Sequence, residues 1–100
     1  MKRGFVEACV LVAVCDQESY GYQIIRDVPG VLGLTESTLY PVLKRLEAAG
    51  HVCSRSAEHN GRLRKYYRIT DSGRARLAQV AAERAEVEQV YDYIGRVCHD

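Results

Sequence analysis

Four polar side chains between positions 37 and 44 are spaced so that a helix would bring them together near its start and along one face. They are Ser37, Thr38, Tyr40 and Lys44, which offer two hydroxyls, a phenol and an ammonium group. Short or planar polar groups near the start of a helix can hold phosphate with the help of the helix dipole and can reach the edges of bases. These residues therefore suit a surface presented to a polar partner.

The residues between them would hold this helix against a core. An apolar stripe follows the i, i+3, i+4, i+7 spacing of a helix and consists of Leu39, Val42, Leu43 and Leu46. Thr35 or Ser37 suits the start of the helix and Gly50 its end. We therefore predict an amphipathic helix over residues 35–50, although any globular domain could contain a capped surface helix of this kind.

A second group of cations surrounds a predicted tight turn. Residues 51–57 and 64–70 alternate with the period of strands, and Asn60-Gly61 in the connection 58–63 favours a reversal because both residues tolerate positive φ. The cations beside this turn are Arg62, Arg64 and Lys65. They suit contacts to phosphates or to the minor groove, and a hairpin whose cations are merely solvated is the alternative.

The charge of the chain is concentrated in one segment. The 100 residues have a net charge of +1, but residues 44–76 hold nine basic and three acidic side chains, a balance of +6. Residues 1–43 have a balance of −2 and residues 77–100 a balance of −3. A local basic patch in a near-neutral chain indicates a site for a polyanion, with a solvated face as the alternative.

Two segments ahead of the amphipathic helix would support it. Residues 5–15 are apolar almost all round, and their length favours a buried helix over a buried strand. Ser19 suits the start of a second helix over residues 20–28, which Pro29-Gly30 would end. A short helix, a turn and the amphipathic helix form a helix-turn-helix, and the hairpin that follows forms a wing.

The last predicted helix begins at Thr70 or Asp71 and runs to about residue 97. Its apolar positions alternate spacings of three and four, with Arg84 as the one interruption, and they include Leu77, Val80, Val87, Tyr91 and Ile94. A stripe of this length exceeds what the core of so short a chain can cover, so we predict a homodimer through this helix. Packing of the helix over the chain's own core is the alternative.

Composition and the N-terminal segment indicate a small globular protein. Hydrophobic residues make up 47% of the chain and charged residues 27%, which is ordinary for one domain. The apolar run after Met1-Lys2-Arg3 superficially resembles a secretion signal, but Glu7 interrupts it. The run is also well short of the roughly 20 residues that span a membrane. We therefore expect a cytoplasmic protein without a membrane segment.

The four cysteines lack the close spacing of a metal-binding knuckle. The pairs of candidate ligands on shared segments are Cys9 with Cys15, His51 with Cys53, and Cys98 with His99. We predict no metal site and no cofactor, and we expect reduced, mostly buried thiols that act as small hydrophobic side chains. A metal- or redox-responsive regulator of the same fold is the alternative.

Several segments resemble the PadR family of bacterial transcriptional regulators. The matching segments are Tyr20-Gly21-Tyr22-Gln23-Ile24, Ser37-Thr38-Leu39-Tyr40-Pro41-Val42-Leu43-Lys44-Arg45-Leu46-Glu47, Gly50, Arg64-Lys65-Tyr66-Tyr67-Arg68-Ile69-Thr70 and Gly73-Arg74. They extend over nearly the whole chain, and the single terminal helix resembles the short subfamily. The resemblance implies a winged helix-turn-helix dimer that binds operator DNA, usually as a repressor released by a small molecule or another signal.

The resemblance also implies roles for individual residues. The residues that would face DNA are the wing cations together with Tyr20, Ser37, Thr38, Tyr40 and Lys44. The terminal helix would pack with the first helix of a partner subunit. Some short members hold a flat aromatic ligand at the dimer interface with a tryptophan of the last helix. This chain has no Trp, and Tyr91 and Tyr93 are the residues that could stand in for it.

The predicted fold is α+β and mostly helical, with a winged helix-turn-helix over residues 1–70 and a dimerisation helix over residues 71–100 in one compact unit. The predicted function is a DNA-binding transcriptional regulator, a repressor that binds a palindromic operator as a homodimer. A protein-interaction module without DNA binding is a further alternative. We do not expect an enzyme, because the three histidines do not lie beside a nucleophile or a carboxylate pair and no phosphate-cradling Gly motif is present.

Overall fold

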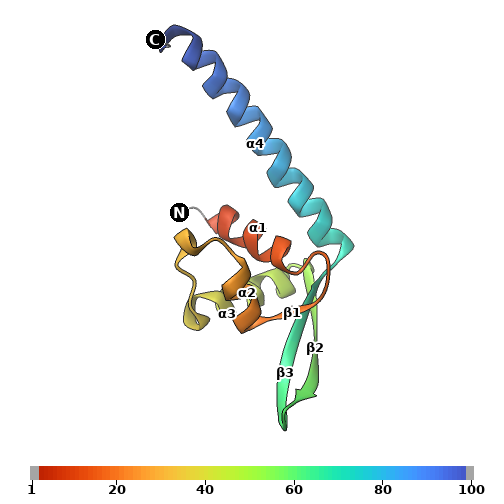
Figure 1. Cartoon of the computed structure of the whole chain (residues 1–100). Coiled ribbons are helices and arrows are strands. Elements are labelled where there is room, and N and C mark those ends of the chain that lie inside the picture. Colours follow the sequence, from red (N-terminus) through yellow and green to blue (C-terminus); the bar gives the residue numbers. More distant parts are fainter. Residues whose placement is uncertain (1–2, 99–100) are drawn as a thin grey trace.

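The computed structural model describes residues 3–98, so Met1, Lys2, Asp100 and the candidate ligand His99 lie outside the described residues. Helices α1 to α3 form a globular unit, from which a hairpin projects on one side and the last helix on the other (Figure 1). The elements in order are α1 (Arg3–Ala13), β1 (Ser19–Tyr20), α2 (Gly21–Asp27), the 3₁₀ turn η1 (Gly30–Leu32), α3 (Glu36–Ala48), β2 (Val52–His59), β3 (Arg62–Ile69) and α4 (Asp71–Cys98). This order confirms the predicted winged helix-turn-helix with a long terminal helix.

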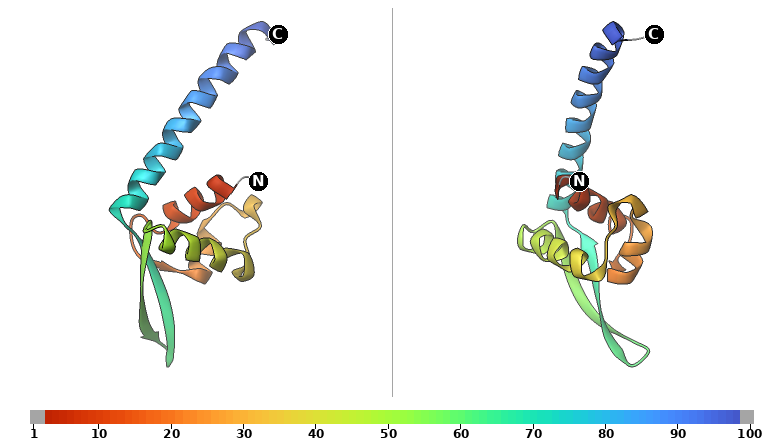
Figure 2. Two further views of the ribbon diagram at one scale, coloured as in Figure 1. Left: turned by 180° about the vertical axis from the view of Figure 1, so that it is seen from behind. Right: turned by 90° about the vertical axis from the view of Figure 1, so that its left-hand side faces the viewer.

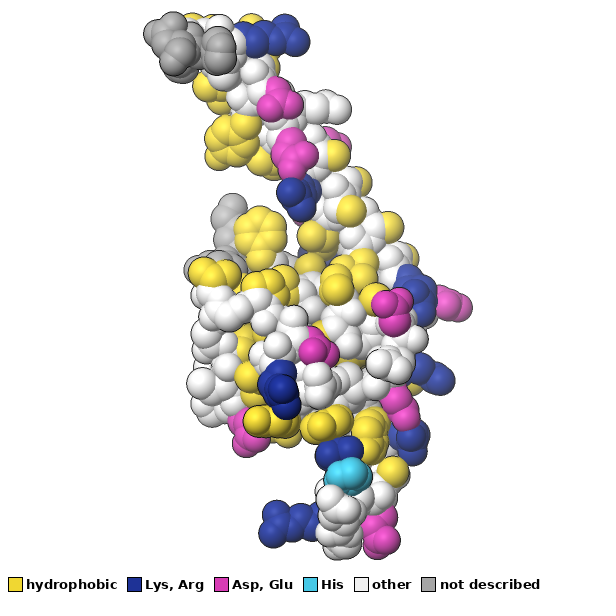
Figure 3. All heavy atoms as spheres, in the orientation of Figure 1, with side chains coloured by type: hydrophobic (Ala, Val, Ile, Leu, Met, Phe, Trp, Pro, Cys, Tyr) yellow, Lys and Arg dark blue, Asp and Glu magenta, His cyan; other side chains and the backbone are white. Residues whose placement is uncertain are grey.

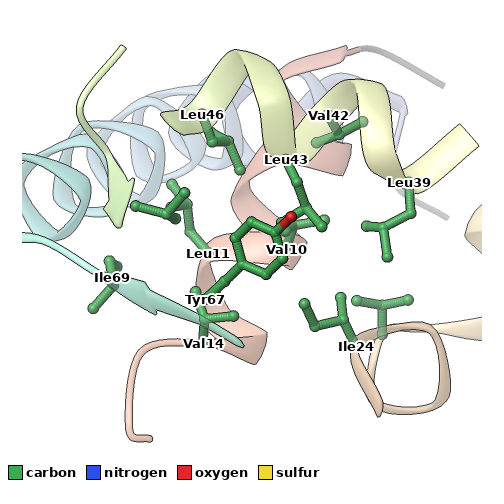
Figure 4. Close-up of a cluster of buried hydrophobic side chains, with 12 residues drawn as sticks. Val10, Leu11, Val14, Ile24, Leu39, Val42, Leu43, Leu46, Tyr67 and Ile69 are labelled. Atoms are coloured by element: carbon green, nitrogen blue, oxygen red, sulfur yellow. The ribbon is translucent and has the colours of Figure 1, made fainter. Parts of the chain in front are cut away.

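The core lies where α1, α2 and α3 meet the base of the hairpin (Figure 4). Its buried side chains are Val10, Leu11, Val14, Ile24, Val28, Leu39, Val42, Leu43, Leu46, Val52, Tyr67 and Ile69. The four residues of the predicted α3 stripe are at most 5% exposed. Removing such side chains from water contributes about 25 cal/mol per Å² of apolar surface, which anchors α3 to the rest of the unit.

Local hydrogen bonds fix both ends of α3. At the start, the Thr35 backbone N–H donates to the Thr38 hydroxyl at 2.8 Å, as in a capping box. At the end, Gly50 adopts a φ of 80°, which a residue without a side chain tolerates best. The His51 N–H then donates to the Leu46 carbonyl at 2.8 Å, the bond of a Schellman motif. The predicted cap at Thr35 and stop at Gly50 are confirmed.

The hairpin is longer than the sequence predicts. Asn60 and Gly61 have positive φ angles of 52° and 79°, as in a type I′ turn, so only two residues connect β2 and β3. The antiparallel ladder runs from Val52 opposite Ile69 up to this turn. Both strands therefore extend two residues closer to the turn than predicted, and Arg62 belongs to β3 and not to a loop.

A short strand corrects the prediction for the start of the second helix. Ser19 was expected to cap a helix that includes Tyr20, but both residues lie in β1 and pair with Tyr67 and Tyr66 of β3. The sheet order is β1-β3-β2, and α2 begins at Gly21. A strand of two residues has no periodicity that a sequence pattern could reveal. Only its contact with the distant β3 defines it.

Helix α4 starts on the globular unit and then leaves it. The Gly73 N–H donates to the Thr70 hydroxyl at 3.1 Å, which confirms Thr70 as a cap, and Leu77 packs against the core. The side chains of residues 81–97 are all exposed, and the distal helix stands clear of the remainder of the chain (Figure 2). No helix within residues 3–98 is long and apolar enough to cross a membrane.

Candidate nucleic-acid interface

The exposed face of α3 carries the four polar residues predicted for contact with DNA. All of them are solvent-exposed, namely Ser37, Thr38, Tyr40 and Lys44. The opposite face of the helix lies in the core, where Leu39, Val42, Leu43 and Leu46 are buried. Ser37, Tyr40 and Lys44 follow spacings of three and four and lie on one side of α3, whereas Thr38 lies about 100° farther round the helix from Ser37.

Two of the hydroxyls on this face also take part in the local structure of α3. The Thr38 hydroxyl accepts the Thr35 N–H and donates to the Thr35 carbonyl at 3.1 Å. The Ser37 hydroxyl lies 3.0 Å from the Thr35 hydroxyl. A hydroxyl has one hydrogen and two lone pairs, so Thr38 has little capacity left for another partner. The main role of the Thr38 side chain is therefore to stabilise the start of α3.

Tyr40 rests against the start of α2. A Cβ added at Gly21 would lie 2.6 Å from the Tyr40 hydroxyl oxygen and 3.1 Å from the ring carbon that bears it. Any residue other than glycine at position 21 would therefore push the phenol aside. The contact holds Tyr40 in place while 46% of the residue stays exposed, and a side chain fixed in advance loses less entropy on binding.

A groove separates α3 from the hairpin. Its lining residues are Tyr20, Gly21, Tyr22, Glu36, Tyr40, Leu63, Arg64 and Lys65. Phenols and cations form most of this lining, and Glu36 is its acidic member. Figure 3 shows further Lys and Arg side chains around the hairpin. The groove joins the polar face of α3 to the wing in one continuous surface.

Two of the three wing cations are open to solvent. Arg62 is exposed next to the turn. The Lys65 side chain is 51% exposed, and its ammonium nitrogen lies 3.8 Å from a carboxylate oxygen of Glu47 on α3. The Ser54 hydroxyl donates to the same carboxylate group at 2.5 Å. An exposed ion pair of this kind contributes little stability, so Lys65 can exchange Glu47 for a phosphate at small cost.

The third wing cation, Arg64, is half-buried between two phenol rings. Its guanidinium carbon lies 3.7 Å from the centre of the Tyr20 ring. Its Nε and Nη2 atoms donate to the Tyr66 hydroxyl at 3.0 and 2.7 Å. Tyr20, predicted to face DNA, is also half-buried in this cluster.

A neighbouring ion pair ties β2 to the segment that precedes β1. The Arg55 Nε donates to a Glu18 carboxylate oxygen at 2.8 Å. This hydrogen bond holds the pKa of Glu18 below its usual value, burial opposes the shift, and the charges of Arg55 and Arg68 add to it. The same hydrogen bond raises the pKa of Arg55. Glu18 and Arg55 are therefore both charged at neutral pH.

The predicted site residues did not include four residues that line the groove: Gly21, Tyr22, Glu36 and Leu63. Tyr22 and Leu63 are 57% and 79% exposed. Tyr22 lies in a segment that carries the family resemblance, so a signal for it was available. Leu63 lies two positions before Lys65 in β3, and strand alternation therefore places both on the same face of the hairpin.

The residues predicted for the dimer interface divide into two groups. Leu77 and Val80 are half-buried against the chain's own globular unit. Val87, Tyr91 and Ile94 are 51%, 68% and 49% exposed. Packing of α4 over its own core, one of the two interpretations of the sequence, accounts for the first group only. The second group forms an apolar stripe that nothing within residues 3–98 covers.

An apolar hollow lies in the angle between α1 and α4. Its lining includes Phe5, Ala8, Cys9, Val12, Pro29, Val31, Leu32, Leu77, Val80, Ala81 and Arg84. Phe5, Val12 and Val31 are more than half exposed. Figure 3 shows hydrophobic side chains on both sides of this angle. The molecule therefore has two exposed apolar surfaces at the end opposite to the hairpin.

The cysteines do not assemble with other ligands in the described part of the chain. Within residues 3–98, no group of three or more His, Cys, Asp or Glu side chains could hold a metal ion. Cys9 and Cys15 are half-buried, whereas Cys53 is exposed. The expectation of mostly buried thiols is therefore wrong for Cys53. Its neighbour Val52 faces the core, so alternation along β2 turns Cys53 outward.

Residues 10–79 match the family model of the transcriptional regulator PadR-like family. The chain belongs to the PadR-like family. The match covers most of the chain, from the second half of α1 through the wing to the first turns of α4. The family membership confirms the resemblance inferred from the sequence.

Known PadR-like proteins and similar regulators extend this comparison. Transcriptional regulator Rv3488 of Mycobacterium tuberculosis is 32% identical over 99 residues, which cover 98% of this chain and 91% of that protein. The structure of smu.1704 from Streptococcus mutans has a TM-score of 0.77 and 36% identity, and the match covers 98% of this chain and 91% of that one. Bacillus subtilis PadR in complex with operator DNA has a TM-score of 0.70 and 27% identity over 77% of this chain and 46% of that chain.

Proposed function

We propose that this PadR-like regulator binds double-stranded operator DNA through the exposed face of α3 and the β2–β3 hairpin. The observation that carries the proposal is a polar helix face beside a cationic hairpin, joined by a groove of phenols and cations. An α-helix fits the major groove of B-DNA. The similar Bacillus subtilis PadR forms a complex with operator DNA, which supports the same activity here.

The residues of this surface would make two kinds of contact, with base edges from α3 and with backbone phosphates from the hairpin. Ser37, Tyr40 and Lys44 contact base edges and nearby phosphates from α3, where hydrogen-bond donors and acceptors distinguish base pairs. Arg62 and Lys65 neutralise phosphates on the neighbouring backbone, which positions the protein without reading sequence. The balance of +6 over residues 44–76 attracts the duplex to this side of the molecule.

We propose that a second copy of the chain covers the exposed stripe of α4. Val87, Tyr91 and Ile94 lie on a part of the helix that leaves the globular unit, and exposed apolar patches mark association surfaces. Each copy offers one stripe and one hollow between α1 and α4. A two-fold dimer buries both at once, because every contact occurs twice. Residues 71–100 thus serve as the dimerisation helix, and residues 1–70 as the DNA-binding part.

The two-fold dimer has consequences for the operator and for regulation. A symmetric pair of reading helices requires a palindromic site with half-sites about 34 Å apart or a multiple of that distance. By family resemblance, the protein acts in the cytoplasm as a repressor that a small molecule or another signal releases. Transcription from a promoter that contains the site should fall when the protein is added, and a rise would make it an activator.

The experiment that tests the proposal selects bound fragments from the genome of the host. The expected result is enrichment of fragments that share an inverted repeat, with binding that weakens steeply as salt rises, since counterions are released from the phosphates. Binding without any enriched sequence would leave only non-specific affinity. No binding at low salt would contradict the proposed function and would favour the interaction module.

A further inference from the structure

Arg64 differs from the other cations of the hairpin in what surrounds it. Its guanidinium carbon lies 3.7 Å from the centre of the Tyr20 ring and 5.1 Å from that of Tyr66. Two of its nitrogens donate to the Tyr66 hydroxyl at 3.0 and 2.7 Å. Arg62 and Lys65 are exposed, whereas Arg64 is half-buried. A phosphate contact would have to compete with these bonds.

The two rings that hold Arg64 belong to different parts of the fold. Tyr66 lies in β3 of the hairpin, and Tyr20 is the residue immediately before α2. The rings meet edge to face, with centres 5.8 Å apart and planes at 73°. Such a geometry is favourable in itself, and a cation over a ring adds to it. Arg64 therefore joins the hairpin to the start of the helix-turn-helix.

A second arginine supports the same connection from the other strand. Arg55 is the cross-strand partner of Tyr66, and its guanidinium carbon lies 5.1 Å from the centre of the Tyr66 ring. It is also bound to Glu18, two residues before Tyr20. The sheet adds only two residue pairs between β1 and β3. The side chains around Tyr66 thus reinforce a very short strand pairing.

We propose that Arg64 is a positioning residue, held between Tyr20 and Tyr66, that sets the direction of the hairpin relative to α2 and α3. The inference rests on the proposed DNA binding, and it removes Arg64 from the group of phosphate contacts. Lysine has the same charge as arginine but lacks the planar fork that stacks on one ring while it bonds to another group. The substitution Arg64→Lys therefore separates positioning from simple attraction of phosphate.

The test measures binding of wild type, Arg64→Lys and Arg64→Ala to a selected operator over a range of salt concentrations. Positioning predicts that both variants bind about 10-fold more weakly, because fewer molecules hold the wing in the competent direction. It also predicts that the slope of log K against log salt stays that of wild type in both. A phosphate contact predicts that lysine restores affinity. It further predicts that alanine lowers the magnitude of the slope by about 1.8 in a dimer, at about 0.9 per contact. That pattern would overturn the proposal.

The matched control is the same pair of substitutions at the exposed Arg62. Arg62→Lys should bind the operator nearly as tightly as wild type does. Arg62→Ala should reduce the magnitude of the slope of log K against log salt, and this result would show that the assay detects a lost phosphate contact. Tyr66→Phe removes the hydroxyl that Arg64 binds without any change of charge. It should weaken operator binding at an unchanged slope, and wild-type affinity for this variant would contradict the proposal.

A measurement without DNA distinguishes positioning from loss of folding. Amide hydrogen exchange should accelerate at residues 18–21 in both Arg64 variants, while the core helices keep wild-type protection. Unchanged exchange at residues 18–21 would overturn the inference, and acceleration throughout the core would show a general structural role and overturn it as well. If wild type itself fails to bind any duplex, the proposed function fails, and the exchange result still decides whether Arg64 fixes the hairpin.

Discussion

Two arms project from opposite sides of the same globular unit, and they expose opposite chemistry. The hairpin arm presents cations, among them Arg62 and Lys65, and the phenol of Tyr40 on α3 lies in the groove beside it. The distal α4 arm presents the apolar side chains Val87 and Tyr91, each more than half exposed. Charged groups are stable in water without a partner, whereas a long apolar stripe is not. The hairpin arm can therefore remain exposed in the free protein, whereas the α4 arm carries the stripe that the proposed second copy would bury.

The arms also differ in how they are attached. Helix α4 joins the unit through apolar contacts of Leu77 and the close fit of Gly73 against the His51 carbonyl. Two hydrogen bonds add to these contacts, one from Arg74 to the Cys15 carbonyl and one between Ser72 and His51. The hairpin is held at its base by Tyr67 and Ile69 in the core and along its outer face by Arg55 with Glu18. The apolar contacts of Leu77 do not depend on pH, whereas the ion pair of Arg55 with Glu18 does. Substitutions on the two arms should therefore differ in how their effect on the thermal midpoint depends on pH.

The largest effect is expected from Val87→Asp on the α4 arm. The substitution would place two uncompensated charges in the proposed dimer interface, and such a charge costs about 3–5 kcal/mol when it is buried. Sedimentation should show monomers that remain folded. Gln89→Asp, which adds the same charge on the opposite side of α4, should leave the dimer intact. If the Val87→Asp variant were still a dimer, the interface would lie elsewhere, and the distal part of α4 would not be the association surface of the molecule.

A smaller effect is expected from Tyr40→Ala beside the hairpin arm. Loss of a base contact costs about 1–3 kcal/mol for the cognate duplex. Binding to a scrambled duplex should change little, and the slope of the salt dependence should stay close to that of wild type, because a phenol releases no counterions. The measurement is a salt titration of both duplexes. Equal weakening of both would mean that Tyr40 does not read sequence.

The smallest effect concerns the attachment of the hairpin arm and its dependence on pH. Arg55 lowers the folded-state pKa of Glu18 below its ordinary value of 4.5, so the ion pair stabilises the fold above that pH. Its contribution is lost as pH falls through the lowered value. The thermal midpoint of Glu18→Gln should therefore be slightly below that of wild type at pH 7, and the difference should vanish in acid. Leu77→Ala on the other arm should lower the midpoint at both pH values.

The sequence pattern predicts the buried faces well because burial repeats with the period of the helix. The stripes of α3 and α4 have the same type of spacing, and the structure buries Leu43 while it leaves Val87 exposed. Periodicity indicates that a face will be covered and does not say by which chain. The predicted length of the last helix, about 26 residues or roughly 39 Å at 1.5 Å per residue, is what favours a partner chain, and the observed helix has 28 residues.

The parts that sequence reasoning missed depend on contacts between distant residues. The strand β1 has two residues, and its pairing with β3 follows from tertiary packing alone. The contacts of Arg64 were not predicted, because its charge and its place near the turn suggest a phosphate contact and give no sign of its bonds to Tyr66 or its stacking on Tyr20. The two-residue turn would have revealed that Arg55 lies opposite Tyr66, since it fixes the register of the whole hairpin.

The most direct test of DNA binding by a dimer is the salt dependence of operator affinity for Lys65→Ala. Each lost phosphate contact lowers the magnitude of the slope of log K against log salt by about 0.9, and a dimer loses two contacts. For the dimer we expect a decrease of about 1.8 in the magnitude of the slope, with equal weakening of binding to cognate and scrambled duplexes. A decrease of about 0.9 would indicate one engaged copy, and an unchanged slope would show that Lys65 does not hold phosphate. Either result would contradict the proposal that a two-fold dimer places Lys65 of both copies on phosphates of the operator.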